Sequence, residues 1–236
     1  SFDQMARALE SRHAHDERQL SRLAALRNID LAITSSLDRR IIFSVLLDEV
    51  TTQLGVDAAA ILLLNPHTRT LEYAAGRGFQ FGRMRRGSVR VGEGHAGRAA
   101  LLRQVISISD LRAGGEMLQP PLVTGELAVA YYAVPLVAKG QVKGVLEVFH
   151  REVLNPDEEW LSFLEALAGQ AAIAIDNASL FSELERSNVA LTLAYDTTLE
   201  GWSNALDLRD KETEGHTRRV TELAVGLARA VGMDEA

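Results

Sequence analysis

The feature that most constrains this chain is a stretch from Asn155 to about Arg209 with helical character throughout. Asn155 is expected as the N-cap and Pro156 as the first helical residue, followed by carboxylates that suit the positive end of a helix. No proline follows, and apolar or small residues recur in steps of three and four. A helix this long cannot belong to one compact core, so we expect it to connect two bodies.

The second half of this helix is apolar along one seam only, which includes Leu184, Leu191 and Thr198. A single seam is typical of a two-stranded coiled coil. We therefore predict a connecting helix at residues 186–208 that pairs with its copy in a homodimer.

The first 35 residues lack glycine and proline and have apolar residues at helical spacing, which predicts a helix. We assign residues 1–36 to an N-terminal coiled-coil or signalling helix that also takes part in the homodimer. Because residues 12–19 are strongly polar, a solvated helix lying on the domain is the alternative.

The composition excludes several kinds of protein. With 47% hydrophobic residues a core can form, and the formal net charge of -7 gives no basis for binding nucleic acid. The absence of cysteine excludes disulfides, thiolate metal sites and thioether-linked chromophores. No run of about eighteen apolar residues predicts a membrane span. We expect a piece of a longer protein, because the chain starts at Ser1 and stops within an amphipathic pattern. We expect this segment to be cytoplasmic, and the absence of cysteine is compatible with a reducing compartment.

Between the two long helices the period changes from helical to alternating. A helix capped by Ser36 or Asp38 is expected to end at Gly55. Short strands are predicted at residues 58–64, 70–75, 88–91, 105–108, 128–137 and 142–149, with a small helix at 95–103. The prediction is an α+β domain of about six mostly antiparallel strands, with flanking helices on one face of the sheet.

Four motifs in this region resemble, in their order, those of a GAF domain. They are Val91-Gly92-Glu93-Gly94-His95-Ala96-Gly97, Tyr132-Ala133-Val134-Pro135-Leu136, Gly144-Val145-Leu146-Glu147-Val148 and the run from Ala168 to Ala178. The resemblance covers residues 37–185. It implies a six-stranded antiparallel sheet and a small-molecule sensor of a kind that often dimerises through its flanking helices.

A ligand pocket is expected between the sheet and the glycine- and arginine-rich loops. The candidate ligand-binding residues are Phe79, Phe81, Arg85, His95 and Tyr132. In the alternative interpretation the arginines form a solvated loop face, His95 only starts a helix, and the domain is a structural dimerisation module without a ligand.

The segment from Gly201 to Val220, which includes Arg209-Asp210-Lys211-Glu212-Thr213-Glu214-Gly215-His216, resembles the opening of an HD-GYP domain. That resemblance implies a cyclic di-GMP phosphodiesterase with an iron or manganese centre, in which Glu212 and His216 are metal ligands. Spacing alone favours a solvent-facing charge pair. We assign residues 209–236 to a truncated start of this domain. We expect no catalytic residue and no bound metal in the chain itself, because hydrolysis by a metal-activated water needs the missing ligands. A hydrolase acting through Glu212 and His216 is a third interpretation.

Overall fold

The computed structural model describes residues 2–35, 38–79, 88–112, 128–210 and 216–231. It divides into two compact units, Ser1–Leu180 and Phe181–Ala236, each of which is described by itself. The elements are α1 (Phe2–Ser35), α2 (Arg39–Leu54), β1 (Ala58–Asn65), β2 (Thr70–Arg77), β3 (Ser88–Arg90), α3 (Gly94–Leu102), β4 (Ile106–Ile108), β5 (Ala130–Ala138), β6 (Gln141–His150), α4 (Glu158–Asp210) and α5 (His216–Ala230). The predicted domain limits at residues 36, 185 and 208 stay predictions.

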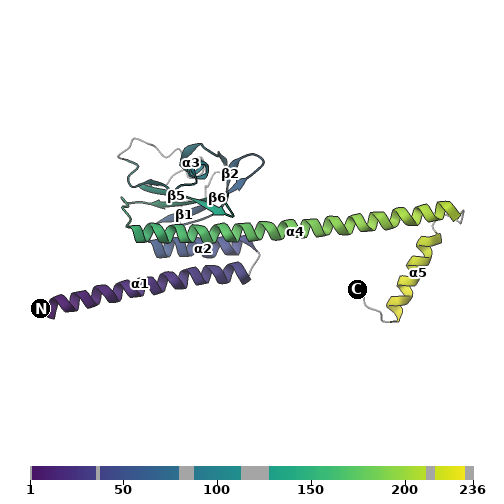
Figure 1. Cartoon of the computed structure of the whole chain (residues 1–236), viewed down its shortest axis with the longest axis horizontal. Coiled ribbons are helices and arrows are strands. Elements are labelled where there is room, and N and C mark those ends of the chain that lie inside the picture. Colours follow the sequence, from purple (N-terminus) through teal and green to yellow (C-terminus); the bar gives the residue numbers. More distant parts are fainter. Residues whose placement is uncertain (1, 36–37, 80–87, 113–127, 211–215, 232–236) are drawn as a thin grey trace. The chain divides into compact units, whose positions relative to one another are not determined.

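The first unit contains a six-stranded sheet in the order β3-β2-β1-β6-β5-β4 (Figure 1). Every pair of neighbouring strands is antiparallel. Helices α2 and α4 cover one face of this sheet, and α3 lies on the other (Figure 1). The predicted fold class, an α+β domain with a six-stranded antiparallel sheet and flanking helices, is confirmed.

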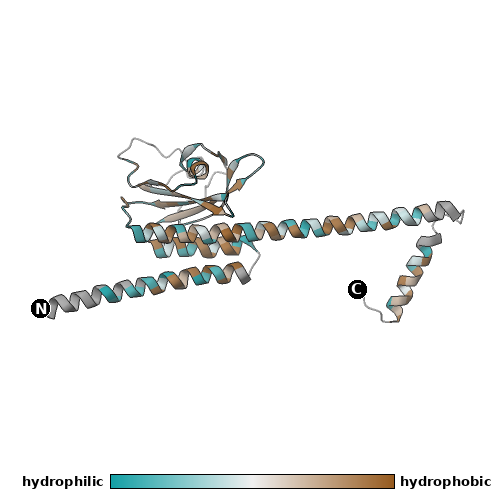
Figure 2. Ribbon diagram, viewed as in Figure 1, coloured by the Kyte–Doolittle hydropathy of each residue, from teal (hydrophilic) through white to brown (hydrophobic). Residues whose placement is uncertain are grey.

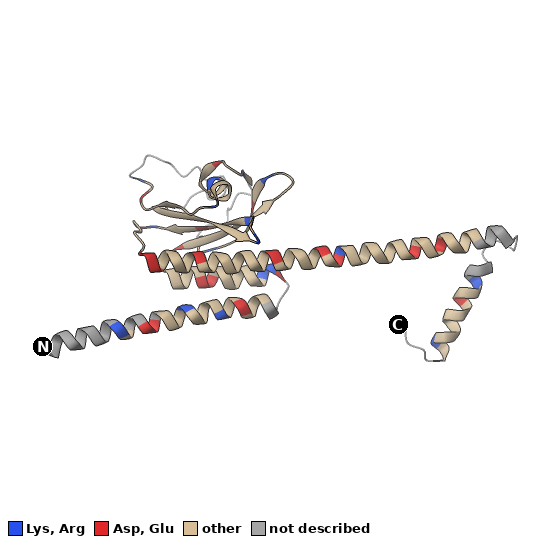
Figure 3. Ribbon diagram, viewed as in Figure 1, with Lys and Arg blue, Asp and Glu red and all other residues tan. Residues whose placement is uncertain are grey.

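The central strands β1, β5 and β6 are buried on both faces. Hydrophobic residues dominate these strands in Figure 2, and charged residues are sparse on them in Figure 3. Their residues alternate between two clusters, because successive side chains of a strand point to opposite faces. The sheet is therefore covered on both sides, and its strands are too uniformly apolar to reveal which residue faces which layer.

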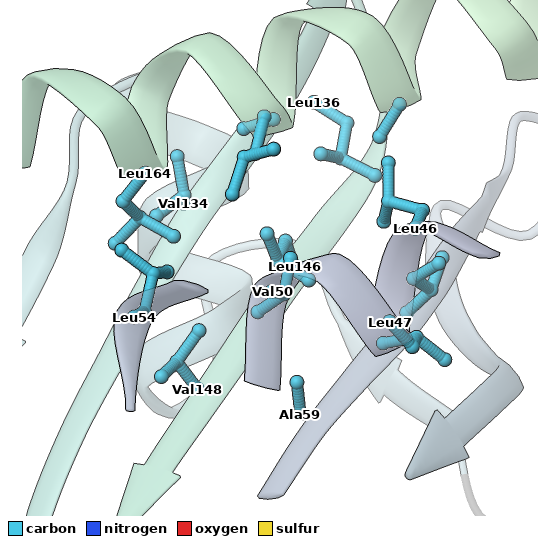
Figure 4. Close-up of a cluster of buried hydrophobic side chains, with 14 of the residues drawn as sticks. Leu46, Leu47, Val50, Leu54, Ala59, Val134, Leu136, Leu146, Val148 and Leu164 are labelled. Carbon is cyan, nitrogen blue, oxygen red and sulfur yellow. The ribbon is translucent and has the colours of Figure 1, made fainter. Parts of the chain in front are cut away.

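The larger cluster fills the space between the sheet and the helices. Figure 4 shows Leu46, Leu47, Val50 and Leu54 of α2 meeting Leu164 of α4 and residues of β1, β5 and β6. Leu46 and Leu164 are fully buried. Since burying one such side chain stabilises a fold by about 1.5–3 kcal/mol, this layer is the main source of stability.

The ends of α2 agree with the sequence prediction. Asp38 is the N-cap, and its carboxylate accepts a hydrogen bond of 2.9 Å from the Arg40 backbone N–H. The helix ends before Gly55, whose N–H donates to the Thr51 carbonyl. Asp38 therefore orients α2 as it enters the helical layer.

The beginning of α4 differs from the prediction, because the helix starts at Glu158 and not at Pro156. The Asp157 carboxylate accepts a 2.8 Å hydrogen bond from the Trp160 N–H, and the Asp157 carbonyl accepts from the Leu161 N–H. Asp157 thus satisfies the free N–H groups of the first turn, so the prediction of Asn155 as the N-cap was wrong.

Within the first unit, the C-terminal half of α1 packs against α2 and α4. Ala25 and Ile29 are buried in the larger cluster. Arg22 pairs with Glu159 of α4 and also lies over the ring of Phe163, 5.0 Å from its centroid. This half of α1 is therefore held to the domain by both apolar and charged contacts.

The second unit consists of the remainder of α4 followed by α5. Helix α4 continues without a break from Glu158 to Asp210, as the periodicity predicted. Helix α5 exposes Val220, Leu223 and Leu227. None of the described helices combines the length and the apolar character that crossing a membrane requires.

Candidate functional site

The candidate site lies on the face of the sheet that α3 covers, where four aromatic rings are in contact. Tyr131 of β5 lies 5.3 Å from Phe149 of β6 and 5.5 Å from His95 of α3, measured between ring centroids. Phe79, just after β2, lies 5.6 Å from Phe149. The predicted residues Phe79 and His95 are thus joined through two aromatic residues that the prediction did not include.

A carboxyl group lies buried beside these rings. Glu147 of β6 is only 8% exposed, and the Tyr131 hydroxyl donates to its Oε1 at 2.6 Å. Burial raises the pKa of Glu147 to about 7, although the hydrogen bond from Tyr131 acts in the opposite direction. Burial and the neighbouring Glu147 also raise the pKa of the Tyr131 hydroxyl well above its usual range. Glu147 therefore exchanges a proton near neutral pH.

Tight backbone contacts place α3 over this cluster. A Cβ on Gly97 would lie 2.3 Å from the Arg90 carbonyl oxygen, so only glycine permits this approach. The Gly92 N–H donates to the Gly97 carbonyl at 2.8 Å. The glycines around His95 thus allow the start of α3 to pack closely against β3, and this packing positions the His95 ring.

Tyr132 does not belong to this site, which corrects the prediction. Its side chain lies in the cluster on the opposite face of the sheet, 5.3 Å from the ring of Trp160. Its hydroxyl donates to the Leu154 carbonyl at 2.9 Å. Adjacent residues of a strand point to opposite faces, so the tyrosine at the site is Tyr131.

The remaining predicted residues lie outside what the structure describes. Phe81, Arg85 and Glu212 fall in undescribed segments, and His216 begins α5 without a described side chain. Within the described ranges, no group of three or more His, Asp or Glu side chains is placed to hold a metal ion. The metal assignment of Glu212 and His216 stays a prediction.

Sequence reasoning missed a cavity of about 430 Å³ between α2 and β2. Its lining combines apolar residues such as Phe43 and Leu47 with Arg39, Arg40 and Arg77. Arg40 pairs with Asp38 and Arg77 with Asp48, so most of this positive charge is neutralised locally. The only signal in the sequence was the adjacent pair Arg39-Arg40 at the start of a helix.

In chemical terms, the aromatic cluster with Glu147 offers ring faces and one hydrogen-bonding carboxyl. Ring faces and a carboxyl are groups that small-molecule sites use, and in the described structure these side chains pack in the core on this face of the sheet. Among its described residues there is no activated nucleophile of the kind that covalent catalysis needs. That a small molecule binds at this cluster stays a prediction.

The chain belongs to the GAF domain family, whose model matches residues 36–176, more than half of the chain. It is 27% identical over 188 residues to the "Phosphoenolpyruvate-dependent phosphotransferase system" protein of Escherichia coli (strain K12), covering 78% of this chain. The chain spans only 25% of the length of that curated relative.

Solved structures share the fold at low sequence identity. The GAF domain of an Acinetobacter phosphoenolpyruvate-protein phosphotransferase superposes with a TM-score of 0.58 at 23% identity, covering 67% of this chain and 94% of the other. The free methionine-R-sulfoxide reductase of Neisseria meningitidis, solved with its substrate, gives a TM-score of 0.57 at 18% identity, covering 70% and 93%. The family is one of signalling sensor domains, found in phosphotransferase-type regulators and in sensor proteins.

Proposed function

We propose that this chain is a cytoplasmic regulatory segment in which a GAF sensor passes its state along α4 to an output domain that follows. The observation that carries the proposal is the attachment of α4 to the β5–β6 hairpin. Asp176 of α4 is 5% exposed and bonds to Lys139 and Lys143 at 2.9 and 2.7 Å. The same hairpin carries Tyr131 and Glu147 on the opposite face of the sheet.

This arrangement offers a short mechanical route. A ligand or proton that shifts Tyr131 or Glu147 displaces strands β5 and β6, and these strands hold Asp176 through their connecting turn. Since α4 is continuous from Glu158 to Asp210, a rotation or shift at Asp176 is carried along the helix. In a homodimer, the paired helices would convert that shift into a change between output domains.

For the output we propose an HD-GYP phosphodiesterase that hydrolyses cyclic di-GMP, as the residues around Glu212 and His216 suggest. Glu212 and His216 would supply two ligands of an iron or manganese centre completed by residues beyond Ala236. Such a centre lowers the pKa of a bound water and stabilises charge on the phosphoryl group. The test uses a longer protein that continues past Ala236. His216→Ala should remove both metal and cyclic di-GMP hydrolysis, while Glu222→Gln, a matched exposed change, should remove neither. Retention of metal and activity in His216→Ala would contradict the assignment.

Native mass spectrometry of the chain purified from cells tests the sensor and dimer proposals together. A dimer with a small retained mass is the expected result, and the mass would indicate the ligand. A dimer without extra mass would leave two functions in place, a weakly binding sensor and the alternative of a purely structural dimerisation module. A monomer at micromolar concentration would contradict helix-coupled signalling. Metal analysis of the same sample tests the third interpretation, because a hydrolase acting through Glu212 and His216 alone would carry stoichiometric iron or manganese.

A further inference from the structure

Helix α4 carries a row of exposed residues, which we term the α4 stripe. It consists of Leu184, Asn188, Leu191, Tyr195, Leu199 and Trp202, of which Leu184 and Trp202 are each 67% exposed and Tyr195 is 63% exposed. Large apolar side chains in a continuous exposed row mark an interaction surface.

The stripe follows a repeat of eleven residues. Each repeat has a large apolar residue first, a second residue four positions later and another apolar residue three positions after that. Leu184, Asn188 and Leu191 form one repeat, and Tyr195, Leu199 and Trp202 form the next. The same pattern occurs eleven residues earlier, at Ile173, Asn177 and Leu180. Asparagine therefore takes the same repeat position twice, at residues 177 and 188.

A seven-residue repeat describes this face less well. Counting in sevens from Leu184 reaches Leu191 and Thr198, but the intervening core positions would be Ser187, Ala194 and Gly201. The eleven-residue repeat instead collects Tyr195, Leu199 and Trp202 on the same face. Its mean spacing of about 3.67 residues per turn matches a nearly straight helix with slight right-handed supercoiling.

The face is also free of charge. At about 100° per residue, the repeat positions from Ile173 to Trp202 lie within roughly 50° of one line along the helix. The five charged residues between 181 and 202 lie about 90° or more from that line. Figure 3 shows how few charged residues this part of α4 carries. The partner that complements this face is therefore an apolar helix and not a charged surface.

We infer that the α4 stripe pairs with the same stripe of a second copy of this chain, parallel and in register, with Asn177 and Asn188 setting the register. This inference rests on the proposed homodimer and specifies its geometry. In a parallel pair every position faces its own counterpart, so leucine meets leucine, and each Asn amide donates to the Asn of the partner. A buried polar residue at one core position selects such a register at some cost in stability.

An antiparallel pair fits the stripe less well. To match Asn177 with Asn188, it must centre near residue 182, which places Tyr195 opposite Gln170 and Leu199 opposite Ala166. Tyr195 and Leu199 would then face a polar and a small side chain, and Trp202 would face Phe163, which is buried within its own domain. The parallel pair uses the whole repeat, about 44 Å of helix from Ile173 to Trp202. At about 10 Å width on each helix, it buries on the order of 900 Å², close to what specific interfaces need.

The test is cross-linking of single-cysteine variants of the full chain, which contains no cysteine of its own. Leu191→Cys lies in the stripe, and Leu193→Cys lies on the opposite side of the helix at similar exposure, 55% against 61%. With a short bis-maleimide, Leu191→Cys should form covalent dimers about tenfold or more faster, because pairing gives the two thiols a millimolar effective concentration. The cross-linking rates of Trp202→Cys and Gly201→Cys distinguish the two repeats in the same way. Trp202 lies in the seam of the eleven-residue repeat, and Gly201 lies in that of the seven-residue repeat.

The outcomes separate the inference from the function on which it rests. A dimer by light scattering in which Leu193→Cys cross-links as fast as Leu191→Cys overturns the stripe but leaves a dimeric sensor in place. A monomer for the unmodified chain overturns both. Fast cross-linking at Leu191→Cys and Trp202→Cys only, in a dimeric chain, supports the parallel stripe.

Discussion

Among single residues, Glu147 should make the stability of the fold depend on pH. Its folded pKa of about 7 exceeds its ordinary value of 4.5, so the folded state binds more protons between these pH values. The free energy of unfolding should therefore fall as pH rises from 4.5 to 7, by up to about 3 kcal/mol. Glu147→Gln keeps an acceptor for Tyr131 and removes this proton, so its chemical denaturation curves should lack that loss. Parallel pH profiles for the two proteins would show that Glu147 does not titrate in this range.

A second residue-level prediction concerns the close approach of β6 to β1. A Cβ on Gly144 would lie 2.1 Å from the Leu62 carbonyl oxygen. Gly144→Ala should force the strands apart and lower the free energy of unfolding by about 1–3 kcal/mol.

Gly169 of α4 is the matched control, since an added Cβ there meets no atom within 4 Å. Gly169→Ala should raise the free energy of unfolding by up to about 1 kcal/mol, because alanine favours a helix interior. Equal effects of the two substitutions in denaturant titrations would count against the described packing.

At the level of elements, the contact between the β5–β6 hairpin and α4 depends on Asp176. Hydrogen bonds from Lys143 and Lys139 lower the pKa of Asp176, so this contact stabilises the fold above the ordinary carboxyl pKa and is lost in acid as pH falls through the lowered value. Asp176→Asn should speed amide hydrogen exchange in the hairpin turn and in the neighbouring turns of α4.

Glu183→Gln, an exposed change two turns further along α4, serves as the control. If Asp176→Asn and Glu183→Gln leave the same exchange pattern, the hairpin does not hold the helix in the way we propose. Loss of ligand response in Asp176→Asn with retained ligand binding would support the route from sheet to helix.

At the scale of the whole molecule, we expect the helices of the second unit to become more ordered as the protein concentration rises. Those of the unit's residues on α4 and α5 whose burial the structure describes are almost all exposed, so few apolar contacts among them hold these helices. A helix without packing is marginal in water. Amide exchange in residues 184–202 should therefore slow as the chain is concentrated through its dimerisation range, whereas exchange in the sheet should not change. Concentration-independent exchange in both regions would contradict association through α4.

The aromatic residues show which features of the candidate site the sequence predicts and which it does not. The motif around His95 and the position of Phe79 indicated two residues that lie on one face of the sheet, because glycines and loop boundaries are local signals. The sequence predicted Tyr132 and not Tyr131 as a site residue, and it gave no indication of Glu147, which stands in the motif Gly144-Val145-Leu146-Glu147-Val148. Strand β5 is apolar on both faces. Its sequence pattern therefore does not show which of the two tyrosines faces α3.

The sequence by itself determined the order of the elements, the unbroken length of α4 and the α+β class. These depend on periodicity, caps and turn residues, which act over a few positions along the chain. The GAF family was indicated by the resemblance of four motifs in their order. Only the tertiary structure decided that Tyr131 and Glu147 share a buried hydrogen bond, that Asp157 begins α4, and that Asp176 meets two lysines. Each of these depends on strand register and layer packing, which bring together residues far apart in the chain.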